Sequence, residues 1–507
     1  MTKRILKNAS FSAASQFANV AISIVFVPAY IYFLKIEGYG IYSFLMLFFG
    51  WITILQAGVD PAVIRMTAKY VAEKKHININ PLITASLMFQ VIIAGSIGLL
   101  VFVFADYLAS FIVKNETNFL NETRIALYYA AINIVVLMCK NVYLSFYKGL
   151  QRYDVSSVYE SIFNLLASLI GLLSLWLGYG IVGMIVVRLI LNLLSIALLH
   201  FMARKIVSTF RLGLNISMGL LKEIYDYASW IVVGRINRLA LNALPPIMIG
   251  MYIGPSGIAF FNIATKITLS LTNLLASSIS VIFPFVSELK ALKNAEKINL
   301  FYMESNRILS IISCPLYCFG AIYSWDILYI WLGADVANNC WALMALFFVG
   351  YYLSSSSMIP SNFALGIGNS KILAFTSITQ TIIVVIFLPY LLNNYGIAGA
   401  GINLIVFEMA SILTGIIITV KYIKASAITF WLRDRIIVLL INIGIFSMLS
   451  LCKAFIINVP LTRTGIIIYL GCVFFTGLSL NYFIIKYSNL VQKSTKNRLA
   501  RLAQKII

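Results

Sequence analysis

The chain has 507 residues, of which 61% are apolar and only 11% are charged, and its mean hydropathy is +0.94. A soluble globular domain carries about 25% charged residues, so this composition excludes an ordinary soluble protein and indicates a membrane protein with many spans. The formal net charge is +21. Because the cations are spread over many short segments, we assign them to membrane topology and anionic lipid contacts, and expect no nucleic-acid partner.

Apolar runs of membrane-spanning length follow one another along the whole chain. About fourteen of them reach the 18 or more residues that cross roughly 30 Å of hydrocarbon. The expected spans are 13–34, 40–60, 81–105, 125–147, 157–178, 180–203, 228–253, 257–285, 308–332, 341–365, 372–392, 397–420, 436–452 and 464–485. The first run is too long for a cleaved signal peptide and has no small-residue cleavage site, so we expect it to remain as a helix. The sequence predicts an all-α polytopic membrane protein.

Lys and Arg are distributed unequally between the two sides of these spans. With a cytoplasmic N-terminus, the inside loops hold 28 of the 38 Lys and Arg residues and the outside loops hold five. The remaining five lie within the predicted helices: Lys140, Arg188, Arg235, Arg238 and Lys266. Because cytoplasmic loops carry the excess of Lys and Arg, both termini are expected in the cytoplasm.

The second half of the chain repeats the first at an offset of 217 residues. Pro28 falls on Pro245, Gly40 on Gly257 and Gly149 on Gly366. A near-constant offset indicates two homologous halves, an internal symmetry common in secondary transporters. We expect an N-lobe of six helices over 1–214, a C-lobe of six helices over 215–425, and two further helices with a basic tail over 426–507.

Cations inside membrane-length runs are binding-site candidates, because a charge in a transmembrane helix is costly unless it faces protein or water. Arg235, Arg238 and Asn242 fall at i, i+3 and i+7, which gives their helix one polar face. Lys266 and Asn273 share a second polar face in the next span.

Two other spans add polar residues to this set. Asn19 belongs to a polar face of the first span, and Lys140 lies in the fourth. Because buried cations outnumber buried anions, an anionic ligand such as a phosphate would supply the missing counter-charge, and guanidinium groups bind phosphate bidentately. Two alternatives remain open: the cations pair internally with Glu160, Asp326 or Glu408, and single polar residues only hydrogen-bond between helices.

Three acidic residues near or within the spans are candidates for ion or proton coupling: Glu408, Asp60 and Asp326. Glu408 lies midway along its helix, whereas Asp60 precedes Pro61 at the cytoplasmic boundary. The chain has only two histidines and no Walker A motif. We therefore expect no metal site, no cofactor and no enzymatic activity.

Several segments resemble a known family. These are NASFSAASQFANVAISIVFVPAYIYFLKIEGYGIYSF, LQAGVDPAVIRMTAKY and YKGLQRYD. They are similar to the polysaccharide transporter branch of the MOP/MATE superfamily, the Wzx-type O-antigen flippases, and the resemblance covers essentially the whole chain. It implies a V-shaped, MATE-like transporter of the bacterial inner membrane. Such a protein moves undecaprenyl-pyrophosphate-linked oligosaccharide repeat units from the cytoplasmic to the periplasmic leaflet by alternating access.

The resemblance also implies roles for the candidate residues. A cationic cavity of the family would include Arg235, Arg238, Lys140 and Lys266, with the two arginines on the pyrophosphate or an acidic sugar and the polyprenyl tail left in bulk lipid. H⁺ or Na⁺ would be the coupling ion, and a polysaccharide polymerase or assembly complex is a partner that the sequence leaves open.

Two other functions are compatible with the same fold. A multidrug/cation antiporter usually carries an acid in the first or seventh helix, and this chain has none in either. A lipid II-type flippase is the second alternative, because its extra C-terminal helices form a groove for the lipid tail.

Overall fold

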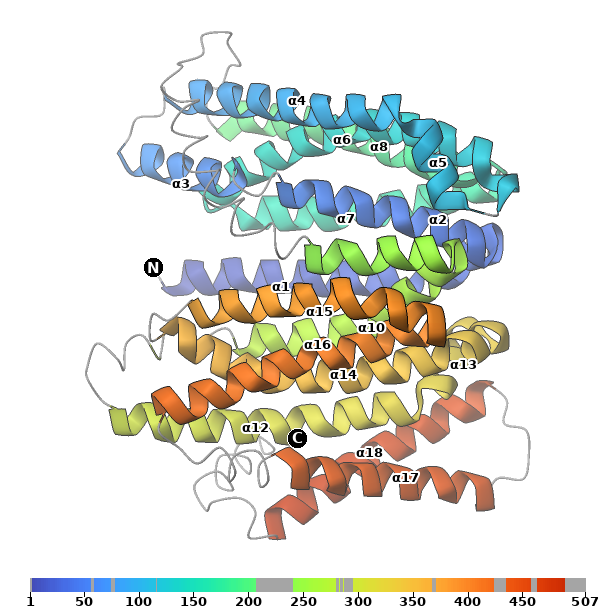
Figure 1. Ribbon diagram of the computed structural model, residues 1–507. Helices are drawn as coiled ribbons and strands as arrows, with labels where there is room; N and C mark the ends of the chain where they lie inside the picture. Colours follow the sequence, from blue (N-terminus) through green and yellow to red (C-terminus); the bar gives the residue numbers. More distant parts are fainter. Residues whose placement is uncertain are drawn as a thin grey trace. The chain divides into compact units, whose positions relative to one another are not determined.

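The computed structural model describes residues 2–55, 59–73, 78–114, 116–206, 240–279, 282, 286, 295–366, 371–423, 435–456 and 463–487. Every regular element within these ranges is a helix (Figure 1). The prediction of an all-α fold is therefore confirmed. The chain divides into two compact units, Met1–Asn262 and Ile263–Ile507. The predicted lobe boundary near residue 215 lies outside the described residues and stays a prediction.

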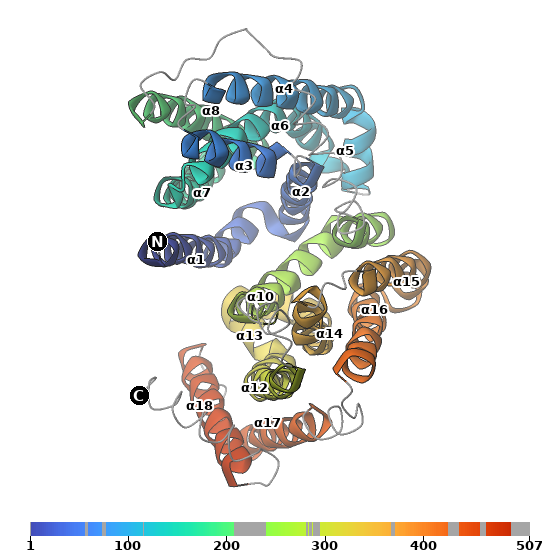
Figure 2. The ribbon, with the colours of Figure 1, turned by 90° about the vertical axis from the view of Figure 1, so that its left-hand side faces the viewer.

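The first unit is built from helices, and its long helices pack against one another. The elements are α1 (Thr2–Val25), α2 (Val27–Leu55), α3 (Val59–Ala72), α4 (Ile79–Val103), α5 (Ala105–Val113), the 3-10 turn η3 (Thr117–Phe119), α6 (Leu120–Gly149), α7 (Tyr153–Trp176), α8 (Gly180–Ile206), helix Ala240–Tyr252 and the start of α10 (Pro255–Ile279). Helix α6 contacts both α4 and α8, and α7 lies against α8 and α1 (Figures 1 and 2). Helix α2 also contacts α6, α7 and α8, so these four helices meet in the first unit.

The second unit contains the rest of the chain. Its elements are the remainder of α10, α12 (Ala295–Ile322), α13 (Ser324–Leu332), α14 (Ala334–Gly366), α15 (Lys371–Tyr395), α16 (Ala398–Ile417), the π-helical turn η4 (Ile418–Ile423), α17 (Ile437–Ile456) and α18 (Arg463–Tyr487). Helix α16 packs between α14 and α15, and α17 packs on α12 and α18 (Figure 2).

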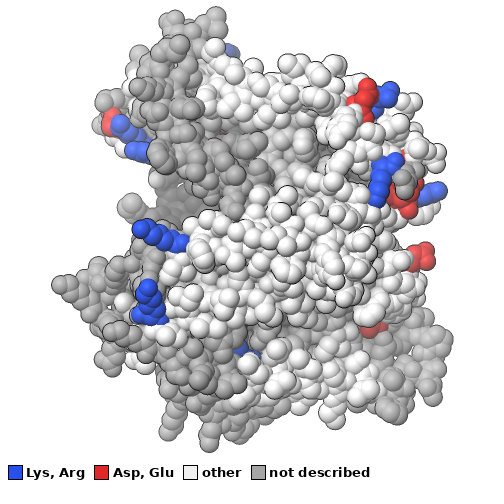
Figure 3. All heavy atoms as spheres, viewed as in Figure 1, with Lys and Arg blue, Asp and Glu red and all other residues white. Residues whose placement is uncertain are grey.

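Many of the described helices can cross a membrane. Ten are long and apolar enough, and α12 with α13 makes an eleventh if that bent pair is one span. Three shorter apolar helices, Ala14–Val25, Ala240–Tyr252 and Ile437–Leu451, coincide with further predicted spans. On the face in Figure 3, most charged side chains lie towards the two ends of the helices and the surface between them is largely uncharged. The protein is a multi-pass membrane protein, although the count of fourteen spans stays a prediction.

The break between the first two predicted spans is a backbone kink. Sequence analysis ends one span at residue 34 and begins the next at residue 40. The structure runs as helix through this region except at Lys35, whose φ of 57° and ψ of −178° lie outside the helical range. A non-glycine residue with positive φ is uncommon, so the kink is a specific feature of this turn.

Two short helices stand where the sequence predicted otherwise. The segment 106–124 was expected to be an outside loop, but α5 occupies much of it. The span 308–332 was expected to be one helix, but it bends by 67° at Tyr323 between α12 and α13. In α5 the buried residues Ala105, Ala109 and Ile112 recur at i, i+4 and i+7, so one apolar face packs inward while Asp106 sits in the first turn.

The repeat seen in the sequence recurs as a repeat of helices. The order α4, α5, α6, α7, α8 returns as α12, α13, α14, α15, α16, with a short helix after the first long one in both units. Helix α6 ends at Gly149 and α14 ends at Gly366, which are 217 residues apart. Gly180 at the start of α8 and Gly396 just before α16 both have a positive φ, 53° and 55°, and are 216 residues apart. The predicted homology of the two halves is thus carried by equivalent helices.

Close packing of α14 on α16 depends on a glycine. A Cβ atom added to Gly401 would lie 2.5 Å from Cβ of Leu346. We predict that Gly401→Ala lowers the free energy of unfolding by about 1–3 kcal/mol through overpacking, measured as thermal denaturation in detergent. Gly444→Ala in α17 is the control, because nothing lies within 4 Å of its added Cβ. Equal melting temperatures of the two variants would contradict this packing.

Candidate functional site

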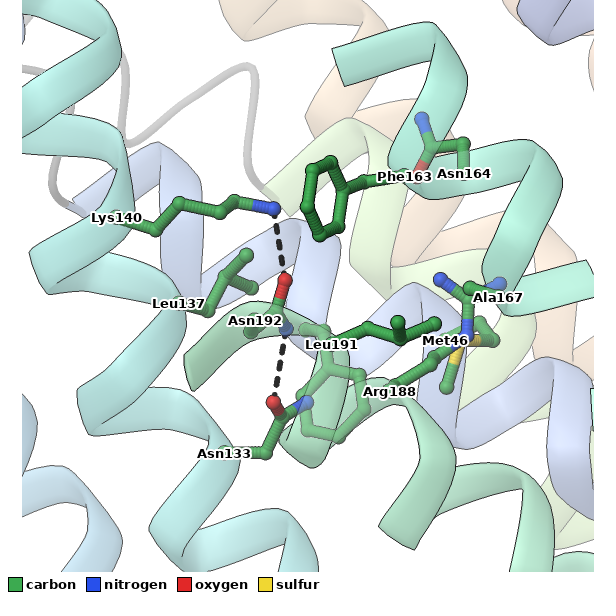
Figure 4. Close-up of a pocket in the computed structure, with 11 residues that line it drawn as sticks. Met46, Asn133, Leu137, Lys140, Phe163, Asn164, Ala167, Arg188, Leu191 and Asn192 are labelled. Atoms are coloured by element: carbon green, nitrogen blue, oxygen red, sulfur yellow. Dashed lines mark hydrogen bonds between the residues drawn. The ribbon is translucent and has the colours of Figure 1, made fainter. Parts of the chain in front are cut away.

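A polar cavity lies within the first unit where α2, α6, α7 and α8 meet (Figure 4). Its volume is about 140 Å³. The residues that line it are Met46, Phe49, Asn133, Leu137, Lys140, Phe163, Asn164, Ala167, Arg188, Leu191 and Asn192. Two cations and three asparagines in so small a space, inside a membrane protein, make this the leading candidate for a binding site.

Lys140 is held by a chain of hydrogen bonds across the cavity wall. Its Nζ donates to Oδ1 of Asn192 at 2.8 Å, and Nδ2 of Asn192 donates to Oδ1 of Asn133 at 2.9 Å (Figure 4). Asn133 is only 1% exposed. Asn192 therefore connects α8 with α6 at two points and directs the ammonium group along the cavity wall.

The second cation, Arg188, lies one turn before Asn192 on α8. Its Nε donates to the hydroxyl of Tyr42 on α2 at 3.3 Å. The aromatic ring of Tyr42 packs edge-on against Tyr30, with ring centroids 5.7 Å apart. The guanidinium is thus anchored at one nitrogen by a neutral hydroxyl, and its other nitrogens face the side of the cavity that α7 lines (Figure 4).

Neither cation has an acidic partner. No salt bridge joins Lys140 or Arg188 to a carboxylate among the residues that the structure describes, and their polar contacts are the neutral groups named above. Glu160, the internal partner considered from the sequence, is exposed and forms no salt bridge with Lys140, although its charge attracts that ammonium group. Two cations that share one small cavity without a carboxylate in contact produce a positive potential, so the cavity is suited to an anion.

Helix α7 closes the cavity with one amide and one aromatic ring. Nδ2 of Asn164 donates to Oδ1 of Asn19 on α1 at 3.2 Å, so the predicted candidate Asn19 holds a residue that lines the cavity. The ring of Phe163 stacks on Tyr159, with centroids 5.3 Å apart and an interplanar angle of 20°. The hydrogen bond ties the α7 wall to α1, and Tyr159, one turn earlier on α7, supports the ring of Phe163.

Three other predicted substrate-binding residues, Asn242, Lys266 and Asn273, do not line this cavity. Arg235 and Arg238 lie outside the described residues. Asn242 is exposed on helix Ala240–Tyr252, and Asn273 is exposed on α10. Lys266 is half-buried on α10 and belongs to the second unit. Of the predicted cations, the structure places Lys140 in the site.

Glu408 is buried in the middle of α16, with 6% of its surface exposed. Its carboxylate is within hydrogen-bonding reach of Ser411 and Ser354, and Nε2 of Gln380 donates to Oγ of Ser411 at 2.9 Å. One carboxylate oxygen, Oε2, has no hydrogen-bond partner among the described residues. A buried carboxylate with one oxygen outside any hydrogen bond is stabilised by taking up a proton or by binding a cation.

The other two predicted acids stand at helix starts. Asp60 is half-buried in the first turn of α3, and Asp326 is 7% exposed in the first turn of α13. Negative charge at these positions is favourable because it offsets the positive end of the helix dipole. No group of three or more His, Cys, Asp or Glu in the described part of the chain could hold a metal ion.

Sequence analysis did not select Arg188, Asn192, Asn133 or Asn164. The signal was present, because Arg188 and Asn192 stand at i and i+4 on one helix, as do Asn133 and Lys140 at i and i+7 on another. The sequence does not show that α6 packs on α8. This packing brings the two polar faces together around one cavity.

Similarity to known proteins shows the family to which the chain belongs. A family model described as polysaccharide biosynthesis protein matches residues 5–290. The chain belongs to this family. A protein of Shigella flexneri named "Putative O-antigen transporter" is 21% identical over 374 residues, which cover 72% of this chain and 86% of the relative. These matches confirm the resemblance to the polysaccharide transporter branch.

Solved structures show the same fold. The lipid II flippase MurJ in an inward closed conformation superposes with a TM-score of 0.70 at 14% identity, covering 96% of this chain and 100% of that one. An inward-facing multidrug resistance MATE transporter of the MOP superfamily superposes with a TM-score of 0.65 at 17% identity, covering 82% and 96%. The chain has the fold of this superfamily. The relative and these neighbours are transporters or flippases, so the predicted transporter class is confirmed.

The asparagine bridge makes a testable contribution to stability. We predict that Asn192→Leu lowers the free energy of unfolding by about 1–3 kcal/mol, because Nζ of Lys140 and Oδ1 of Asn133 lose their partner inside the protein. Thermal denaturation in detergent measures the change. Asn394→Leu is the control, since exposed Asn394 donates only to Tyr390 O of its own helix. A melting temperature for Asn192→Leu at the control value would show that the bridge contributes nothing.

Proposed function

We propose that this protein is a flippase that moves undecaprenyl-pyrophosphate-linked oligosaccharide repeat units, of an O-antigen or a similar surface polysaccharide, from the cytoplasmic to the periplasmic leaflet. The observation that carries the proposal is the cavity with Lys140 and Arg188, two cations that form no salt bridge within the described part of the chain. A pyrophosphate supplies the missing negative charge and accepts hydrogen bonds from both cations. The name of the Shigella flexneri relative supports the same substrate class.

The cavity chemistry argues against export of cationic drugs. A cation entering the space between Lys140 and Arg188 would meet two like charges, which is unfavourable in a low-dielectric site. The asparagine amides beside them suit a phosphate or a sugar, because each amide both donates and accepts hydrogen bonds. The substrate of a lipid II-type flippase has the same anionic head group. The transported glycan must therefore be identified from the polysaccharide that a mutant cell fails to make.

The proposal places the protein in the bacterial inner membrane with both termini in the cytoplasm. The excess of Lys and Arg in the loops on one side supports this orientation. Alternating access of two homologous lobes would carry the head group across the membrane. Arg235 and Arg238, together with Lys266, Asn242 and Asn273, remain proposed contacts for the pyrophosphate and sugars as the substrate moves.

We assign ion coupling to Glu408. Its buried carboxylate, with one oxygen free of hydrogen bonds among the described residues, can take up H⁺ or hold Na⁺ beside the hydroxyls of Ser354 and Ser411. Binding of either ion neutralises a charge that is costly in the membrane interior. The energy of an ion gradient can thereby be linked to a change of conformation in the second unit.

The central test removes the two cavity cations. Lys140→Ala combined with Arg188→Ala should abolish surface polysaccharide in a strain that depends on this gene, and lipid-linked repeat units should accumulate on the cytoplasmic leaflet. Each single change should weaken binding of the head group by on the order of 10- to 100-fold, as expected for a lost hydrogen bond to a charged group. Surface glycan and membrane protein level are measured together.

Matched controls keep this test specific. Arg204→Ala and Lys205→Ala remove exposed cations from the end of the same helix α8 and should leave surface polysaccharide unchanged. Full activity of the double cavity variant at normal protein level would refute the proposed site. Loss of peptidoglycan synthesis with intact surface polysaccharide would instead identify a lipid II-type flippase.

A second test addresses coupling. Glu408→Gln keeps the size and hydrogen-bonding capacity of the side chain but cannot release a proton or neutralise a cation. We predict that transport by this variant no longer responds to an imposed H⁺ or Na⁺ gradient, while head-group binding in the first unit is retained. Gradient-driven uptake in proteoliposomes measures the response, and Glu304→Gln on α12 is the control. An unaltered response to both gradients would exclude Glu408 as the coupling residue.

A further inference from the structure

The first unit has a second cavity with the opposite chemistry. It is an open groove of about 330 Å³ between α7 and α8. Its lining is mostly apolar: Ile170, Leu173, Ser174, Leu177, Tyr179, Val182, Gly183, Val186 and Val187. The hydroxyl of Ser174 already donates to Gly171 O at 2.7 Å. Leu173 and Leu177 are 52% and 57% exposed, so the groove presents apolar surface with little polar character.

On α7, this groove continues the anion cavity along one helix face. Phe163 and Ala167 line the anion cavity, and Ile170, Ser174 and Leu177 line the groove. These five positions follow at i, i+4, i+7, i+11 and i+14, which is the spacing of a single helical face. The polar and the apolar site are therefore consecutive segments of the same side of α7.

On α8 the same succession runs in the opposite chain direction. Leu191 and Arg188 line the anion cavity, whereas Val187 and Gly183 line the groove. Leu191, Val187 and Gly183 are separated by four residues each and share one face. Gly183 lets the helices approach here, since an added Cβ would lie 3.0 Å from Oγ of Ser174. The cavity therefore continues into the groove along α7 and along the Leu191 edge of α8, whereas Arg188 lies on α8 about 100° or more around the helix from the groove residues.

We infer that the groove holds the part of an isoprenoid chain that adjoins the pyrophosphate bound between Lys140 and Arg188. The inference rests on the proposed function and goes beyond it. An amphiphile with an anionic head and a hydrocarbon tail matches the order of the two sites along α7 and α8. The charged head needs a water-filled path across the membrane. A tail that lies in the groove keeps its apolar surface out of that water. The tail then accompanies the head along α7 and α8 instead of staying in bulk lipid.

The test compares two probes on the full-length protein in lipid nanodiscs. Inorganic diphosphate occupies the anion cavity alone, whereas geranylgeranyl diphosphate also offers an isoprenoid chain. In the wild-type protein the chain should increase affinity by about tenfold or more. Leu173→Trp and Val186→Trp fill the groove and should remove this gain while binding of inorganic diphosphate stays within about twofold. Leu169→Trp and Ile190→Trp are the matched controls, because they add the same ring to exposed positions of α7 and α8 outside the groove.

Three outcomes would overturn the inference. The first is that both groove variants keep the wild-type gain from the chain. The second is that they lose affinity for both probes equally, because the tryptophans would then act on the anion cavity. The third is that dioleoyl phosphatidic acid shows the same groove-dependent gain, since the groove would then hold acyl chains of bulk lipid.

Failure of the proposed function has a separate signature. If Lys140→Ala with Arg188→Ala leaves binding of inorganic diphosphate unchanged, the anion site is wrong, whatever the groove variants show. Suppose instead that the double variant loses diphosphate binding while the groove variants keep the affinity gained from the isoprenoid chain. The groove proposal alone would then be wrong.

Discussion

The cost of a charge in hydrocarbon governs this structure. A cation buried in a membrane protein needs a polar neighbour, water or a ligand, and otherwise costs several kcal/mol. Lys140 and Arg188 have neutral neighbours that orient them, Asn192 and Tyr42, but no acidic partner among the described residues. Their hydrogen bonds hold α6, α8 and α2 in place around a small cavity. The interactions that organise the first unit therefore also create its capacity to bind an anion.

The two halves of the repeat have equivalent helices but carry different charged residues. At an offset of 217 in α6 and 216 in α8, Lys140 corresponds to Ser357, Arg188 to Leu404 and Asn192 to Glu408. Glu408 therefore stands at the repeat position of Asn192, the neutral residue that joins Lys140 to Asn133. The first unit thus carries cations and the second an acid at places where their repeats are uncharged. Such a division lets one unit bind an anionic head group while the other responds to a coupling ion.

The sequence predicted the fold well because hydropathy and length decide which segments are membrane helices. It could not predict α5 or the bend before α13, since short apolar helices and continuing spans have the same composition. It selected Lys140 and Glu408 because charges within apolar runs are visible without a structure. It missed Arg188 as a site residue because only the packing of α8 on α6, α7 and α2 shows that this guanidinium shares a cavity with Lys140. Arg235 and Arg238 lie outside the described residues.

Translocation in a purified system tests the central claim most directly. Proteoliposomes with the full-length protein would be loaded with a fluorescent polyprenyl-diphosphate disaccharide and with the same disaccharide on a polyprenyl monophosphate. Appearance of each in the opposite leaflet would be followed by quenching from outside. If two cations hold a pyrophosphate, the protein should accelerate the diphosphate and move the monophosphate far more slowly. Equal rates for the two lipids, or no acceleration of the diphosphate over empty liposomes, would contradict the account.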